Sequence, residues 1–221
     1  MNNNKSVKNP PHDLTAFALG NSGIPYVHSF DSGQPGPHVM VNCLTHGNEL
    51  CGLKAVTVLL DHGIRPRAGR LTLSFANIAA YARYDVDNPQ ASRFVDRDLN
   101  RLWQDSVIDN DTTSTEAVRA KELRPLIRDV DALLDLHSTT YCRVPFFAFP
   151  DRPHPRDLAK SLTSRLARVV LKPGGMKGTT LMEYDHFMDA KRNAGWFFTG
   201  CFSYDEFSII QEGIFDSYAR N

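Results

Sequence analysis

The sequence predicts an α/β fold in which a mostly parallel or mixed sheet carries helices on both faces. One observation is a set of short, nearly continuous apolar segments, which are typical of strands buried on both faces. The second is that these segments alternate with longer ones whose apolar residues recur at helical spacing. Strands that alternate with helices along a chain usually form a largely parallel sheet.

The first half of the chain is expected to supply three strands, one helix and a long loop. The strands are predicted at residues 24–30, 38–44 and 70–77. Leucine and valine recur at helical spacing from Glu49 to about Asp61, and Gly63 can end that helix. Residues 78–110 are expected to form a loop. A loop of that length inside a compact domain is usually functional or disordered.

The second half begins with a predicted helix. Thr113 and Glu116 have the spacing of a capping box, and the helix is expected to run to about Asp129 with a bend at Pro125. A buried strand then leads directly to His137. This strand spans residues 132–136, and the remaining predictions are a strand at residues 144–149 and an amphipathic helix at residues 156–170.

Candidate ligands for a metal follow two of the predicted strands. In "VNCLTHGNEL", His46 and Glu49 lie on the turn between a strand and a helix, and His137 ends another strand. In open α/β sheets, ligands bind beyond the carboxyl ends of the strands. We therefore expect these three side chains to meet at one edge of the sheet.

Two histidines and one carboxylate form the ligand set of a catalytic zinc ion, with the fourth position open for water. A zinc ion held in this way lowers the pKa of that water to about 7 and polarises a substrate carbonyl. By itself the H-x-x-E spacing of His46 and Glu49 is weak, because a helix start with a surface histidine would explain it. The third ligand, His137, favours the metal site.

The predicted long loop contains "RFVDRDLNR", which places Arg93, Asn100 and Arg101 close together in sequence. The planar guanidinium of arginine binds carboxylates in a bidentate manner, and asparagine adds an amide donor. Such a loop over a zinc site would suit a substrate with a free carboxylate. The alternative is a solvated loop in which Asp96 and Asp98 pair with its own arginines.

Three motifs together resemble one known family. "THGNE", "RDLNR" and "DLHST", in this order, are similar to the aspartoacylase and succinylglutamate desuccinylase family, a branch of the zinc carboxypeptidase-like fold. The resemblance covers approximately residues 39–194. It implies hydrolysis of the amide bond of N-acyl amino acids with one zinc ion as cofactor.

The resemblance also implies residue roles. His46, Glu49 and His137 would bind zinc, Arg93 would support the developing oxyanion, and Asn100 and Arg101 would bind the substrate carboxylate. The side chain of Asp135 shares a strand face with that of His137. It could orient this histidine or could be a buried structural carboxylate.

The chain departs from the family at one catalytic position. The family carries a general-base glutamate in a later strand, and alignment on "RNA" puts that position at about Phe198. Glu183, Glu206 and Glu212 lack the family context. We expect residues 1–221 to be a single catalytic domain without the family's C-terminal β domain. The atypical, aromatic-rich tail, residues 195–221, fits either a core strand with a hydrophobic tail or a truncated or frame-shifted gene.

Composition limits the partners. Lys plus Arg and Asp plus Glu number 25 each, so no global field would hold a nucleic acid. No apolar run approaches the length of a membrane helix, and the N-terminus lacks the apolar core of a signal peptide. The four cysteines form no C-x-x-C pair, which is typical of buried thiols in a reducing compartment. We expect a cytoplasmic protein that binds a small carboxylate, with homo-oligomerisation left open.

Three functions remain under consideration. The first is a zinc-dependent hydrolase that removes the acyl group of an N-acyl amino acid or a similar small carboxylate. The second is a non-catalytic or truncated family member that binds zinc and a carboxylate ligand, which Phe198 favours. The third is a peptidase that acts on peptide C-termini, because the same zinc chemistry cleaves peptides.

Overall fold

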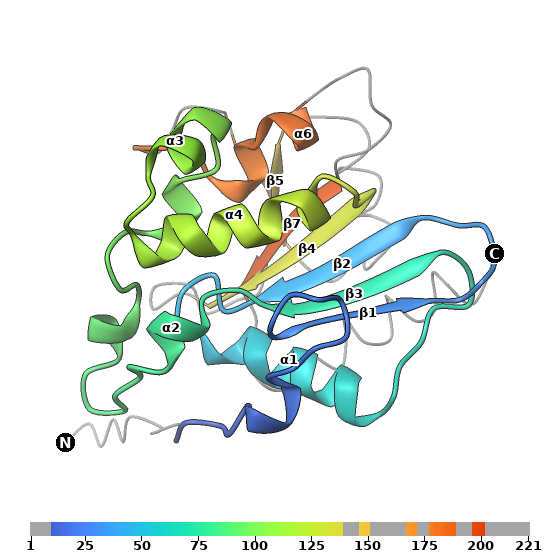
Figure 1. Ribbon diagram of the computed structural model, residues 1–221, viewed down its shortest axis with the longest axis horizontal. Coiled ribbons are helices and arrows are strands. Elements are labelled where there is room, and N and C mark those ends of the chain that lie inside the picture. The colour runs from blue at the N-terminus through green and yellow to red at the C-terminus, as the bar shows by residue number, and fades with distance from the viewer. Residues whose placement is uncertain (1–9, 139–145, 151–166, 172–176, 189–195, 202–221) are drawn as a thin grey trace.

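The structure, a computed structural model, describes residues 10–138, 146–150, 167–171, 177–188 and 196–201. Within these residues one seven-stranded sheet runs through the molecule in the order β1-β3-β2-β4-β7-β5-β6 (Figure 1). The strands are β1 (Val27–Asp31), β2 (His38–Cys43), β3 (Arg70–Phe75), β4 (Ala132–His137), β5 (Phe146–Pro150), β6 (Ala167–Leu171) and β7 (Trp196–Cys201).

The sheet is mixed, with a parallel centre. Strands β3, β2, β4 and β7 are all parallel to their neighbours in that order, whereas β1 is antiparallel to β3 and β5 is antiparallel to β7. The outermost pair, β5 and β6, is parallel again. This confirms the predicted mixed sheet. It also brings the carboxyl ends of β2 and β4 to the same edge, because these two strands are parallel neighbours.

Helices cover both faces of the sheet. In Figure 1, α1 lies on one side of the sheet, and α3, α4 and α6 lie on the other. The α-helices are α1 (Leu50–Asp61), α2 (Ile78–Tyr81), α3 (Asp105–Asn110), α4 (Thr115–Ile127) and α6 (Asp185–Met188). Short 3-10 helices occupy Thr15–Phe17, Pro89–Ser92, Leu99–Arg101 and Leu181–Glu183.

The core has two parts because side chains alternate between the faces of each strand. Val41 and Cys43 of β2 pack in one buried cluster with Leu53 of α1. Met40, which directly precedes Val41 and so faces the opposite side of the sheet, belongs to a second cluster with Leu123 of α4. A strand buried on both faces is apolar at nearly every position. That burial explains the continuous apolar run that predicted β2.

The predicted loop at residues 78–110 is wrong in part. The segment contains α2, two 3-10 helices and α3. The helix α2 begins where the Asn77 side chain accepts a hydrogen bond from the Ala80 amide at 3.2 Å. These helices have three to six residues each. Helices this short show too few apolar repeats for a periodicity argument to detect them.

The predicted capping box at Thr113 and Glu116 is also wrong. The residue that caps α4 is Ser114, whose side chain accepts a hydrogen bond from the Ala117 amide. The Glu116 carboxylate accepts hydrogen bonds from the loop amides, among them that of Val95, and none from Thr113, a residue that the structure also describes. The helix itself is confirmed, ends at Ile127 and contains Pro125.

The predicted helix at residues 156–170 is contradicted at its end. Ala167–Leu171 form strand β6, which pairs with β5, while residues 156–166 lie outside the described part. Two adjacent valines favour a strand here, and pairing with β5 outweighs the helical pattern. Strand β1 begins three residues later than predicted. Its start follows Tyr26, whose positive φ of 61° interrupts extended structure.

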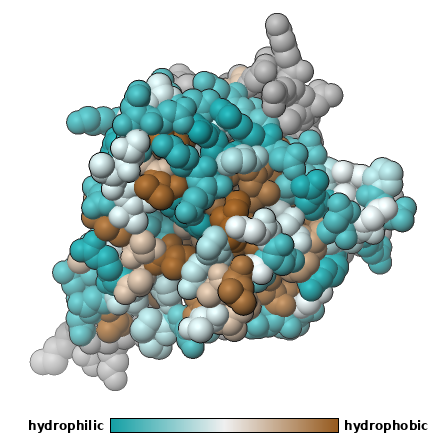
Figure 2. Space-filling view, in the orientation of Figure 1, coloured by the Kyte–Doolittle hydropathy of each residue, from teal (hydrophilic) through white to brown (hydrophobic). Residues whose placement is uncertain are grey.

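The surface seen in this orientation is mainly hydrophilic. Figure 2 shows hydrophobic residues there as separate small patches among hydrophilic ones. Among the described residues, no helix combines the length and apolar character needed to cross a lipid bilayer.

Candidate metal centre

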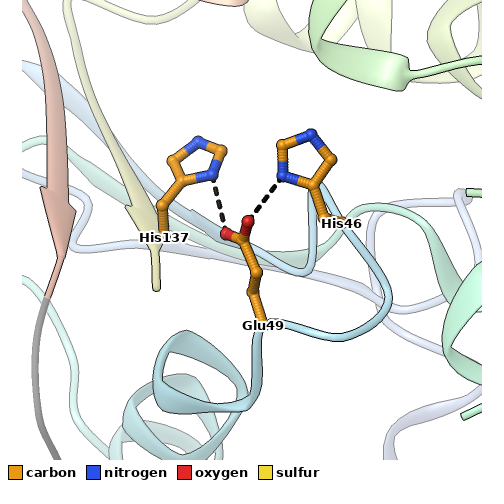
Figure 3. Close-up of side chains that lie close together, drawn as sticks. All are labelled: His46, Glu49 and His137. Carbon is orange, nitrogen blue, oxygen red and sulfur yellow. Dashed lines mark hydrogen bonds and ion pairs between the residues drawn. The ribbon is translucent and has the colours of Figure 1, made fainter. Parts of the chain in front are cut away.

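His46, Glu49 and His137 converge at the carboxyl edge of the central strands. His46 lies on the turn after β2, Glu49 immediately precedes α1, and His137 is the last residue of β4. In Figure 3 the Glu49 carboxylate lies between the two imidazole rings. The three residues are 2%, 5% and 7% exposed, respectively. The structure therefore brings together the three side chains that the sequence analysis selected.

The turn between β2 and α1 has the backbone that this convergence requires. Leu44 has a positive φ of 55°, so the chain turns sharply as soon as β2 ends. Gly47 packs so closely against the end of α2 that an added Cβ atom would lie 2.5 Å from the Tyr81 nitrogen. The Gly47 amide also donates a hydrogen bond to the Arg93 carbonyl at 3.1 Å. Only glycine fits there, which accounts for the glycine of "THGNE".

The inner nitrogens of both histidines face the same carboxylate. His46 Nδ1 lies 2.8 Å from Glu49 Oε1, and His137 Nδ1 lies 2.8 Å from Glu49 Oε2. One ligand atom from each residue lies within 4.8 Å of the other two. Ligand atoms around a tetrahedral zinc stand roughly 3.4 Å apart. The donor set and its spacing therefore fit one metal ion.

The outer nitrogens of both histidines face other carboxylates. His137 Nε2 lies 2.6 Å from Asp135 Oδ2, and His46 Nε2 lies 2.9 Å from Asp98 Oδ1. Metal-binding histidines usually donate the N–H of the far nitrogen to a carboxylate or carbonyl, which leaves the near nitrogen free for the ion. His137 has Asp135 as the partner for that tautomer and His46 has Asp98, while Arg93 Nη2, a donor, also lies 2.9 Å from His46 Nε2.

Asp135 is held by a buried polar network. Its Oδ1 accepts hydrogen bonds from Asn42 Nδ2 at 2.8 Å and from Thr45 Oγ1 at 2.9 Å. Asn42 in turn accepts one from the Ser74 hydroxyl. The Asp135 side chain is fully buried. The sequence left open whether Asp135 orients His137 or is merely structural, and this contact ties it directly to the histidine ring.

The electrostatics of the cluster favour a cation. Burial raises the pKa of Glu49, but the charge of His137 and hydrogen bonds from His137 and His46 outweigh it and hold this pKa well below its usual range. Burial lowers the pKa of His137, yet the charges of Asp135 and Glu49 prevail and raise it well above 6.5. Carboxylates that stay ionised around an imidazole that gains a proton create a site suited to positive charge.

Arg93 lies beside the cluster. Its guanidinium Nη1 donates a hydrogen bond to Glu49 Oε1 at 3.1 Å, and its Nη2 lies 2.9 Å from His46 Nε2. The same Nη2 is 3.7 Å from Asp98 Oδ2. Arg93 was predicted to lie over the metal site, and in the structure it contacts two of the three candidate ligands.

Asn100 and Arg101 follow Asp98 in the same loop, in the short 3-10 helix Leu99–Arg101. The Asn100 side-chain oxygen accepts a hydrogen bond from the Leu181 amide at 2.8 Å, which directs its NH₂ group away from Leu181. Arg101 donates from Nη1 to the Asn100 carbonyl at 2.6 Å. The loop links both residues to the cluster through Asp98, which accepts the Asn100 amide at 2.8 Å.

Asp98 is a site residue that sequence reasoning missed. The charged-loop alternative paired it with the loop's own arginines, but its shortest side-chain contacts are to His46 and the Asn100 amide. Burial raises the pKa of Asp98, but the hydrogen bond with His46 and the charges of His46 and Arg101 lower it to about 2. Only the fold brings Asp98 to a histidine 52 residues earlier in the chain.

The position matched to the family's general base lies inside β7. Phe198 is level with Leu134 of β4, whereas Thr199 is level with Asp135 and Cys201 with His137. The matched position therefore lies three residues before the end of β7 that adjoins the metal cluster. Glu183 is engaged elsewhere, because its carboxylate accepts hydrogen bonds from the amide and hydroxyl of Thr180. Glu206 and Glu212 lie outside the described residues.

A mixed sheet with a His-Glu-His cluster at its carboxyl edge defines the class of zinc carboxypeptidase-like α/β domains. The family model described as the succinylglutamate desuccinylase/aspartoacylase catalytic domain matches residues 35–184. The chain belongs to this family.

Individual relatives agree with this assignment. A human protein named N-acyl-aromatic-L-amino acid amidohydrolase (carboxylate-forming) is 33% identical over 120 residues, which cover 48% of this chain and 35% of that protein. The chain thus spans about a third of the length of this curated relative.

Solved structures share the fold. Succinylglutamate desuccinylase from Chromobacterium violaceum has a TM-score of 0.66 at 20% identity, over 89% of this chain and 65% of that one. A mutant of murine aminoacylase 3 has a TM-score of 0.59 at 22% identity, over 83% of this chain and 65% of that one.

Proposed function

We propose that this chain is a zinc-dependent hydrolase that cleaves the amide bond of an N-acyl amino acid or a similar small carboxylate. The observation that carries the proposal is the convergence of two imidazoles and one carboxylate within 4.8 Å, each imidazole backed by a further carboxylate. Membership of the desuccinylase and aspartoacylase family supports the reaction class. The name of the human relative supports an N-acyl amino acid as the substrate class.

In this proposal His46, Glu49 and His137 would hold one zinc ion, because one ligand atom of each lies within 4.8 Å of the other two. Zinc, when bound, supplies a Lewis acid for the acyl carbonyl and activates a water molecule. Asp98 and Asp135 accept the protons on the far nitrogens and thereby keep both Nδ1 atoms available. The three ligand side chains themselves are buried, which limits their competing hydration.

The loop residues would bind and orient the substrate. Arg93 lies 3.1 Å from Glu49, so its guanidinium is within reach of an acyl oxygen at the cluster and would stabilise charge that develops there. Asn100 has its oxygen fixed by Leu181 and its NH₂ group available to a substrate carboxylate. Arg101 would add a second donor to that carboxylate.

Metal analysis combined with a substrate panel tests this function. We expect purified protein to carry or take up about one zinc per chain, and to hydrolyse at least one N-acyl amino acid. His46→Ala should lose most of the zinc and the activity, whereas His62→Ala, an exposed histidine that follows α1, should keep both. Peptides with a free C-terminus belong in the panel. Cleavage of these peptides alone would favour a peptidase.

A second candidate function is a zinc- and carboxylate-binding protein without catalysis. The specific observation that favours it is Phe198, level with Leu134, where the family resemblance expects a general base. Phenylalanine cannot accept a proton from water. Stoichiometric zinc without turnover of any acyl amino acid or peptide would favour this candidate over the hydrolase.

A further inference from the structure

Glu116 is a carboxylate buried inside the domain and outside the metal cluster. It lies in the first turn of α4 and is fully buried. Burying a carboxylate is costly unless hydrogen bonds or charges replace its hydration. A residue of this kind therefore indicates a specific set of partners.

Its partners are three consecutive amides of residues 93–101, the segment that carries Arg93, Asn100 and Arg101 and is called the substrate loop. Oε1 accepts a hydrogen bond from the Val95 amide at 2.6 Å, and Oε2 accepts those of Asp96 and Arg97 at 3.0 Å each. Asn77 Nδ2 donates a fourth hydrogen bond to Oε1 at 3.0 Å. Successive backbone N–H groups that converge on one anion form a concave anion site. Here a side chain of the same protein fills that site.

A reciprocal contact docks the loop on the same helix start. Asp96 Oδ2 accepts hydrogen bonds from the Thr115 amide at 2.8 Å and from the Thr115 hydroxyl at 2.6 Å. Arg97 pairs with Asp111 at 2.5 Å, just before the helix. The short segment from residue 95 to residue 97 is thus bound to α4 through both its backbone and its side chains.

This segment separates the two loop residues that reach the cluster. Arg93 lies two residues before it and contacts Glu49, and Asp98 follows it directly and contacts His46. Both ends of the segment are therefore positioned by an anchor in α4. Loss of the anchor would let Arg93 and Asp98 move together relative to the two ligands that they contact.

We propose that Glu116 is a positioning residue that holds Arg93 and Asp98 against the metal cluster by binding the three amides between them. The anchoring part stands on the contacts of Glu116 alone. The part that concerns zinc and substrate rests on the proposed function. Hydrogen exchange tests the anchoring part, and zinc affinity with kinetics tests the part that concerns zinc and substrate.

The first readout is amide hydrogen exchange in Glu116→Gln, with Glu122→Gln as the matched control. Glutamine keeps the shape of the side chain, but its NH₂ group would face backbone N–H donors. Glu122 is an exposed residue of the same helix that pairs with the largely buried Arg119, so its change removes the same charge without contact to the loop. We expect the amides of Val95, Asp96 and Arg97 to exchange at least about tenfold faster in Glu116→Gln only.

The second readout is zinc affinity and steady-state kinetics of the same variants. Because Asp98 backs His46, we expect zinc to bind about tenfold more weakly in Glu116→Gln, with KM raised and kcat lowered. Glu122→Gln should match the unaltered protein. If Glu116→Gln fails to fold, Asp96→Asn, an exposed change that weakens the same docking, should show the same effects at smaller size.

The outcomes are distinguishable. Unchanged exchange at these amides in a folded Glu116→Gln protein would overturn the inference. Faster exchange with zinc affinity and KM equal to those of Glu122→Gln would also overturn it, because Glu116 would then be merely structural. An unaltered protein that binds no zinc and turns over no substrate would refute the proposed function instead. In that case the exchange data alone would decide whether Glu116 fixes the loop.

Discussion

At the scale of single residues, the two histidines of the cluster are held in different ways. Both face Glu49 with Nδ1, at 2.8 Å. The far nitrogen of His137 meets Asp135, which is fully buried and fixed by Asn42. That of His46 meets Asp98, which belongs to the substrate loop. The orientation of His137 therefore depends on the sheet, whereas that of His46 depends on the loop.

The contact between Asp135 and His137, both on β4, leads to a prediction for Asp135→Asn. An amide accepts the His137 proton less strongly than a carboxylate, so the ring loses part of its orientation and basicity. We expect zinc to dissociate about 10- to 100-fold more readily, as measured by competition with a chelator of known affinity. Asp61→Asn, the same change at an exposed position at the end of α1, should leave zinc affinity unaltered. Equal affinities in both variants would exclude a role for Asp135 at the metal.

A negative charge introduced at Asn100 tests whether this residue binds the substrate carboxylate. Because its oxygen already accepts the Leu181 amide, Asn100→Asp would place a second oxygen where the NH₂ group was. The new charge would repel a substrate carboxylate, and we expect KM to rise about tenfold or more with zinc content unchanged. Asn88→Asp, the same change at an exposed position five residues before Arg93, is the control. An unchanged KM would place the substrate carboxylate elsewhere.

At the scale of secondary structure, the sequence predicted helix α4 correctly but its capping residue wrongly. Thr113 and Ser114 are adjacent, and either suits an N-cap. The structure selects Ser114, because Glu116, the expected partner of Thr113, is drawn away by the amides of the loop. A long-range contact thus decided a local choice.

Alanine substitutions at the two positions should separate these alternatives. Ser114→Ala removes the acceptor of the Ala117 amide and the donor to Asp111, so we expect the free energy of unfolding to fall by about 1 kcal/mol. Thr113→Ala should change it by less than about 0.5 kcal/mol. Chemical denaturation of both variants measures the difference. A larger loss at Thr113 would restore the capping box that the sequence predicted.

Strand β2 begins at a buried histidine, which provides a stability test that depends on pH. His38 contacts the Asp129 carbonyl at 3.0 Å and the Thr72 hydroxyl at 2.8 Å. Burial lowers the pKa of His38 below 6.5, aided by the charge of Arg70 and opposed by contacts with Asp129. The unfolded chain therefore binds this proton more readily than the folded one. The contribution to stability is present above pH 6.5 and is lost as the pH falls below it.

His38→Gln removes that titration while keeping a polar side chain. We expect the unfolding free energy of the unaltered protein to fall more steeply between pH 7 and about pH 5 than that of the variant. Denaturation curves at several pH values provide both slopes. Identical slopes would show that His38 does not contribute to the acid sensitivity of the fold.

The elements that the sequence predicted best are those buried on both faces. Strands β2 and β4 carry nearly continuous apolar residues, β3 carries them at alternate positions and α1 carries them at helical spacing, so the local pattern locates these elements. The predictions failed where pairing decides the structure, as in β6, or where elements are very short, as in α2. Strand order and the antiparallel edges depend on contacts distant in sequence, which no local pattern contains.

At the scale of the whole molecule, the candidate metal-binding cluster is assembled from three separate parts of the chain. Parallel pairing of β2 with β4 brings His46 and His137 to the same edge. The turn into α1 adds Glu49, and the loop between β3 and α4 adds Arg93 and Asp98. The three expected ligands could be selected from sequence because strand ends are recognisable. Asp98 and Glu116 could not, because their partners are distant in the chain.

X-ray absorption at the zinc edge of the zinc-loaded protein tests the central claim most directly. The claim is that His46, Glu49 and His137 together bind one zinc ion. We expect two imidazole ligands and oxygen or nitrogen scattering at about 2.0–2.2 Å, with no sulfur. Cys51 provides a clear alternative, because its Sγ donates to the His137 carbonyl at 3.2 Å and so lies next to the cluster. Sulfur scattering at about 2.3 Å, or the absence of bound zinc, would contradict the assignment.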